Sequence, residues 1–150
     1  MISVFRVKTR QAEGDEIGIY RKYLNIFSEN HKTAYEAIKS SSKGQGYILL
    51  CMKERWSLNP PETNFGLASL EPVLGEVFWR SWTTVNMQRQ FNPNIPEEPT
   101  FKSAFKRCIK EYLDQKLSKT PTLVSDEYNF QRCLDVLNEM GLEYKIMSEG

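Results

Sequence analysis

The sequence predicts an α+β fold, or a small three-layer α/β fold, in the order β-α-α-β-α-α-α-β. We expect a small sheet of about three strands, packed by about four or five helices. Three observations predict this class. The chain opens on a short alternating run, its most apolar run lies at 46–54, and segments of helical periodicity surround both. Roughly thirty residues of helical pattern separate the two runs, which is the size of a βαβ unit.

The first part of the chain supplies one strand and two helices. Residues 2–8 alternate and predict the first strand. Residues 15–30 predict a helix, because apolar side chains recur every three or four positions. Gly18 weakens that helix, and a short strand over 16–20 is the alternative. A second helix over 33–41 begins with a capping box. The apolar stripe of the first helix comprises Ile17, Tyr20, Leu24 and Phe27.

The middle of the chain begins with the apolar run 46–54, which predicts a buried strand. Residues 56–66 contain two consecutive prolines and predict an irregular loop. A third helix is predicted over Ser69–Arg89, where Pro72 suits a first turn. Three prolines in eight residues make 92–99 a stiff loop.

The last part of the chain contains the clearest helical pattern, over 100–117, with one continuous apolar stripe. The segment 119–126 ends that helix, and Ser125 or Asp126 is expected to cap the next one. Residues 142–147 alternate and predict a final strand. The buried side of the last helix is predicted to comprise Tyr128, Phe130, Cys133, Leu134 and Leu137.

Length and composition indicate one globular domain spanning residues 1–150, because domains commonly hold roughly 100–200 residues. The chain is 40% hydrophobic, 12% aromatic and 26% charged, which is ordinary for a folded domain. A net charge of +1 creates no overall field for nucleic acid or an anionic membrane. The sequence shows neither a signal peptide nor a membrane span, so a cytoplasmic protein without a membrane partner is expected.

Cysteine and histidine offer little for metal or covalent chemistry. Cys51, Cys108 and Cys133 lie far apart in apolar patterns, so we expect three free, buried thiols. The single histidine, His31, is expected at the surface or in a cap. The usual His/Cys zinc ligand set is absent, and neither a metal nor a cofactor is predicted.

Other candidates for catalysis have simpler explanations. The paired carboxylates Asp15–Glu16, Glu97–Glu98 and Asp126–Glu127 fall at helix starts or in a loop, where capping and the helix dipole favour acids. The glycine-containing segment 40–46 lacks the spacing of a phosphate-binding loop and precedes a strand. No catalytic residue is therefore assigned.

Two surfaces are candidates for binding. On the predicted third helix, Trp79 points away from the apolar side, which makes it either a packed residue or an anchor for a partner. The partner-binding candidates are Trp79, Arg80, Thr83, Asn86 and Arg89. A basic and aromatic set could instead contact a polyanion. This set comprises Lys53, Arg55, Trp56, Lys102, Lys106 and Lys110.

These observations favour a non-catalytic binding protein that masks a surface of a macromolecular partner, most simply another protein. Inhibitors, immunity proteins and antitoxins of phage, mobile-element or other viral or bacterial origin are examples of this class. One alternative is a nucleic-acid-binding accessory subunit. The other is a small enzyme whose site the fold assembles from several of Arg6, Arg10, Glu54, Arg55, Glu76 and Arg80.

Overall fold

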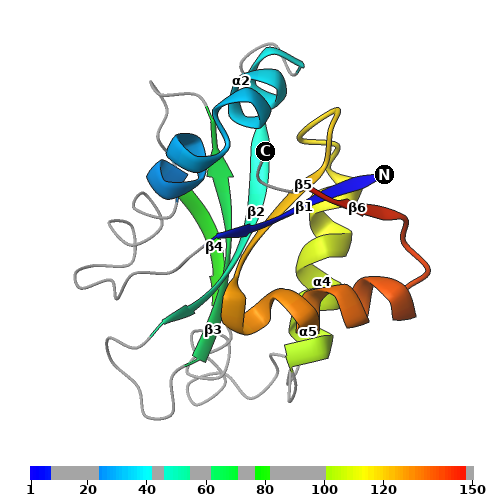
Figure 1. Ribbon diagram of the computed structural model, residues 1–150. Helices are drawn as coiled ribbons and strands as arrows, with labels where there is room; N and C mark the ends of the chain where they lie inside the picture. The colour runs from blue at the N-terminus through cyan, green and yellow to red at the C-terminus, as the bar shows by residue number, and fades with distance from the viewer. Residues whose placement is uncertain (8–23, 42–45, 55–61, 71–76, 82–100, 148–150) are drawn as a thin grey trace.

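A computed structural model describes residues 1–7, 24–41, 46–54, 62–70, 77–81 and 101–147. These residues form a small α/β domain around a mixed six-stranded sheet of order β4-β3-β2-β5-β1-β6 (Figure 1). The strands are β1 (Ile2–Val7), β2 (Tyr47–Glu54), β3 (Glu62–Ser69), β4 (Val77–Ser81), β5 (Thr122–Asp126) and β6 (Tyr144–Ile146).

Two halves of the sheet differ in strand direction. β5 is parallel to both β1 and β2, and β6 is parallel to β1. β3 is antiparallel to β2 and β4, so β2, β3 and β4 form a meander. The predicted βαβ unit joins β1 to β2, and these strands are parallel, but β5 lies between them.

Helices cover both faces of this sheet. The described helical segments are 24–30, α2 (Lys32–Ser41), α4 (Phe101–Asp114) and α5 (Glu127–Glu139). α4 and α5 pack on one face, and α2 with the preceding helical residues packs on the other (Figure 1). The result is three layers, which suits a sheet whose central strands are apolar on both sides.

Alternation along the strands divides the core into two clusters. Val4, Leu49 and Leu123 face α4 and α5, whereas Phe5 and Val124 face α2 and residues 24–30. Every residue of β5 is buried, because the strand lies in the middle of the sheet with helices on both sides.

The hydroxyl of Tyr112 links α4 to the sheet. It donates a hydrogen bond to the backbone carbonyl of Tyr47 and accepts one from the backbone N–H of Thr122 at 3.3 Å. Burial raises the pKa of Tyr112 to about 12, because an apolar environment disfavours the phenolate. The neutral phenol therefore joins α4 to both β2 and β5.

The prediction of a small α/β fold is confirmed, but several elements are wrong. Residues 77–81 of the predicted third helix form strand β4. Part of the predicted loop 56–66 belongs to β3, and the segment expected to end the long helix contains β5. The described residues thus form a sheet of six strands in place of about three.

Other predicted elements are confirmed. The first and second apolar runs form β1 and β2, and the structure contains the helices expected near 33–41 and 100–117 and the last helix expected after Ser125 or Asp126. Residues 24–30 are helical, as predicted, whereas 15–23 lie outside the described residues, as does the loop 92–99. Within the described ranges, the structure contains no helix long and apolar enough to cross a membrane.

Candidate functional site

The helices that follow β1 and β5 in the sequence lie on opposite faces of the sheet. The first described helix after β1 packs on one face of the sheet, and α5, which follows β5 directly, packs on the other. The two strands are neighbours, with Arg6 opposite Ser125 and Val7 opposite Asp126. In open α/β sheets such a switch point is the usual place for a ligand.

The acidic residue at this position, Asp126, forms hydrogen bonds with the first turn of α5. Asp126 is buried, and its carboxylate accepts hydrogen bonds from the backbone N–H and the side-chain amide of Asn129, each at 2.9 Å. The hydroxyl of Ser125 donates to the backbone carbonyl of Asp126 at 3.0 Å. Asp126 therefore caps α5, as one of the two residues that the sequence indicated.

The capping contacts continue onto the surface. Asn129 accepts a hydrogen bond from Nη1 of Arg132 at 3.1 Å through its side-chain oxygen. The guanidinium of Arg132 lies 3.9 Å from the ring centre of Phe101 and 5.5 Å from that of Tyr128. We call Phe101, Tyr128 and Arg132 the α5 surface. A buried acid thus fixes the position of an arginine that stacks on two aromatic rings.

Tyr128 is the exposed member of the α5 surface. Its side chain was predicted to be buried, but the residue is 55% exposed. The correction follows from helix geometry, because two residues turn through about 200° and Tyr128 cannot share a face with Phe130. Phe130 is half-buried on the other flank of α5, under the guanidinium of Arg6 at 5.4 Å from its ring centre.

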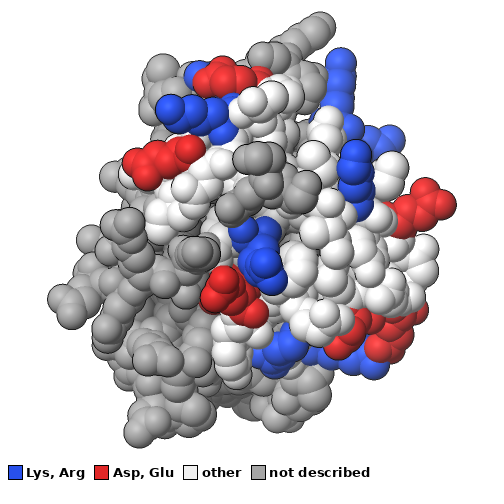
Figure 2. Space-filling view, in the orientation of Figure 1, with Lys and Arg blue, Asp and Glu red and all other residues white. Residues whose placement is uncertain are grey.

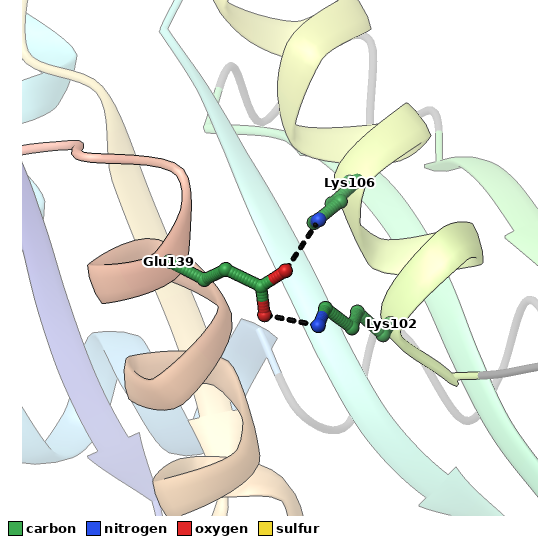
Figure 3. Close-up of polar contacts among 3 residues, drawn as sticks. All are labelled: Lys102, Lys106 and Glu139. Atoms are coloured by element: carbon green, nitrogen blue, oxygen red, sulfur yellow. Dashed lines mark hydrogen bonds and ion pairs between the residues drawn. The ribbon is translucent and has the colours of Figure 1, made fainter.

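The lysine row of α4 is partly neutralised. Glu139, at the end of α5, forms ion pairs with Lys102 and with Lys106, the latter at 3.0 Å (Figure 3). The hydrogen bond from Lys102, and then that from Lys106, lower the pKa of Glu139. Lys110 is exposed. Figure 2 shows basic and acidic residues interspersed over the visible face, without a broad area of one sign among the coloured residues.

The predicted partner-binding residues lie mostly outside the part of the chain that the structure describes. Thr83, Asn86 and Arg89 do so. Trp79 and Arg80 belong to β4, opposite Gly66 and Phe65 of β3. The helix on which Trp79 was expected to face outward is therefore wrong at this position. The use of Trp79 as an anchor stays a prediction.

The remaining basic and enzymatic candidates that the structure describes lie on different strands of the sheet. Lys53 and Glu54 are the last two residues of β2, paired with Thr63 and Glu62. Arg6 lies on β1, two strands away from β2 in the sheet. The other candidates, Arg10, Arg55, Trp56 and Glu76, fall outside the described ranges.

Histidine and cysteine occupy core positions. His31 is buried, which corrects the expected surface or capping position, and its ring lies 4.9 Å from that of Phe5. Cys51, Cys108 and Cys133 are free and buried, as predicted. Among the described residues, no group of three or more His, Cys, Asp or Glu side chains is placed to hold a metal ion.

The sequence reasoning missed Arg132 and misplaced Tyr128. A tyrosine and an arginine four residues apart are neighbours on one side of a helix, and this spacing was the available signal. The contribution of Phe101 had no such signal, because it depends on how α4 crosses α5. No protein-family model matches the chain, and comparisons with curated proteins and with solved structures also found no match.

Proposed function

We propose that the protein is a non-catalytic binding domain that masks a surface of a partner protein, and that the partner docks on the α5 surface. The observation that carries this proposal is the 55% exposure of Tyr128 beside the stacked guanidinium of Arg132. Tyrosine and arginine are among the residues that contribute most to protein–protein affinity.

The supporting contacts suit such a role because they hold the surface in one arrangement before binding. Asp126 orients Asn129, Asn129 holds Arg132, and Arg132 contacts both aromatic rings. Immobilising a long side chain on binding costs about 0.5–1.5 kcal/mol, so a side chain that is already held loses less. The neighbouring Gln131 and Asp135 are exposed and could form a polar rim.

The charge arrangement favours a protein partner over a polyanion. Two of the three candidate lysines on α4, Lys102 and Lys106, already share the carboxylate of Glu139. Nucleic-acid binding depends on basic groups that are free to replace counterions, and each neutralised lysine weakens that contribution.

Three variants of the full chain test the proposal. Tyr128→Ala removes the exposed ring, Tyr128→Phe keeps it, and Glu36→Ala changes an exposed residue of α2 in the opposite layer. The full chain would be used to capture proteins from an extract of the source organism, and the captured proteins would be identified by mass spectrometry. The affinity of each purified candidate would then be measured by calorimetry.

We expect Tyr128→Ala to weaken binding about thirtyfold, which corresponds to a hot-spot loss of roughly 2 kcal/mol. Tyr128→Phe should keep most of the affinity, and Glu36→Ala should keep all of it. The free energy of unfolding should change by only about 0.5 kcal/mol in each variant. Equal affinities for Tyr128→Ala and the unmodified chain would refute the docking surface. Retention of nucleic acid with a steep salt dependence would favour the accessory-subunit alternative.

A further inference from the structure

Two buried thiols face each other between the sheet and α5. The sulfur of Cys133 lies 3.6 Å from that of Cys51 on β2, and 3.9 Å from the hydroxyl oxygen of Ser125. Both cysteines have no exposed surface. They are 82 positions apart in the sequence, so the fold alone brings them together.

We propose that Cys51 and Cys133 are an oxidisable pair, which a peroxide converts into a disulfide that ties α5 to β2. One thiol loses its proton, and the resulting thiolate attacks a peroxide oxygen. The O–O bond breaks to give a sulfenic acid and, with hydrogen peroxide, a hydroxide that takes up a proton to become water. The second thiol attacks the sulfenic sulfur, the S–S bond forms, and a second water leaves. Two thiols are oxidised and one peroxide is reduced to two waters. The inference does not depend on the proposed function.

The geometry requires only a short movement. A disulfide bond is about 2.05 Å long, so the two sulfur atoms must approach by roughly 1.5 Å. A change of rotamer together with a small shift of α5 toward β2 can supply that approach. The link would also close a long loop, and long loops gain most from a crosslink in the chain-entropy description.

Burial makes the pair unreactive while α5 is closed on the sheet. Burial, followed by the hydrogen bond with Cys133, raises the pKa of Cys51 and so suppresses the thiolate that would attack an oxidant. Oxidation therefore has to proceed through a local opening that separates α5 from β2. The free energies of such local openings lie between that of fraying at the chain ends and that of global unfolding.

The third thiol provides a matched control. Cys108 of α4 is also buried in the same cluster. The close sulfur contact is nevertheless between Cys51 and Cys133. Cys108→Ser should therefore retain the crosslink, whereas Cys133→Ser should abolish it.

The experiment treats the full chain with hydrogen peroxide at several urea concentrations below the unfolding transition. The samples are alkylated and examined by intact mass and by peptide mapping. We expect loss of two hydrogens, a Cys51–Cys133 linked peptide, and a rate that rises severalfold with mild urea. The oxidised chain should then resist protease cleavage within α5 more than the reduced chain.

Three outcomes would overturn the proposal. The first is a linked peptide that contains Cys108. The second is oxidation of Cys51 and Cys133 to sulfinic or sulfonic acids without a link. The third is the absence of any reaction throughout the folded range of urea. Mapping of the unsubstituted chain distinguishes these outcomes even if a serine variant fails to fold.

Discussion

Asn129 donates two hydrogen bonds to the buried carboxylate of Asp126, one from its backbone N–H and one from its side-chain amide, each 2.9 Å long. In an open α/β sheet, ligands usually bind outside the carboxyl ends of the strands at a switch point, which is where Asp126 lies. Here the same carboxylate holds the first turn of α5 and, through Asn129, positions Arg132. Its described contacts therefore assign it a structural role.

Replacing that cap should destabilise the domain. Asp126→Ala leaves buried donors of α5 without their acceptor, and we expect a loss of about 2 kcal/mol in the free energy of unfolding. Asp126→Asn keeps an acceptor oxygen and should lose less than half as much. Urea unfolding followed by circular dichroism measures both variants. Equal stability of Asp126→Ala and the unmodified chain would show that the cap contributes little.

Alkaline pH should destabilise the protein through Tyr112, because its pKa is raised from 10.0 to about 12 in the folded state. Above pH 10 the unfolded chain releases this proton first, so the folded state binds more protons and stability falls as pH rises. The contribution of Tyr112 to the free energy of unfolding is complete below pH 10 and is lost by about pH 12. Two pKa units correspond to about 3 kcal/mol.

Tyr112→Phe isolates that contribution from the other groups that titrate in the same range. The variant should lose about 1–2 kcal/mol at neutral pH, because the hydroxyl no longer contacts Tyr47 and Thr122. It should lose less further stability between pH 10 and 12 than the unmodified chain does. Guanidinium unfolding across that range measures the difference, and parallel pH profiles would contradict the assigned shift.

The sequence predicted the elements whose periodicity is simple. β1 and β2 combine apolar side chains with strand length, and α4 and α5 have helical stripes bounded by recognisable ends. β5 was missed because it is only five residues long and includes Thr122, Ser125 and Asp126. A strand buried on both faces shows no alternation, and those polar side chains also concealed its apolar character.

The meander was missed for a different reason. β3 closely follows two prolines and contains Gly66, and both residue types indicate loops in a single sequence. β4 lies in a segment where apolar residues recur at helical spacing, so local periodicity conflicted with the pairing to β3. The pairing of β4 with β3 therefore outweighs the local helical pattern.

The contacts that build the α5 surface could not be read from the sequence. Trp79 and Arg80 were considered as anchors on a helix, and residues 77–81 instead form a strand. The α5 surface depends on a contact across helices, that of Arg132 with Phe101. The ion pairs of Glu139 with the lysines of α4 also join two helices. No periodicity within one segment reports such contacts.

Removing Glu139 should reveal the basic character of α4. Glu139→Gln releases Lys102 and Lys106 from their shared carboxylate, so binding of single-stranded DNA should strengthen severalfold with a steeper salt dependence. Glu36→Gln on α2 makes the same charge change in the opposite layer and serves as the control. Fluorescence anisotropy across a salt series measures both. Identical salt slopes for the two variants would mean that Glu139 does not mask a polyanion surface.

A direct comparison of Trp79→Ala with Tyr128→Ala decides which residue anchors the partner. If Trp79 is the surface anchor, its replacement abolishes partner binding and leaves the unfolding free energy nearly unchanged, whereas truncation of a tryptophan in a core costs about 3–5 kcal/mol. We expect binding to depend on Tyr128, because its ring is 55% exposed beside Arg132. Calorimetric affinity and urea unfolding measured on both variants separate the cases. Loss of binding in Trp79→Ala alone, at unchanged stability, would transfer the docking surface to β4.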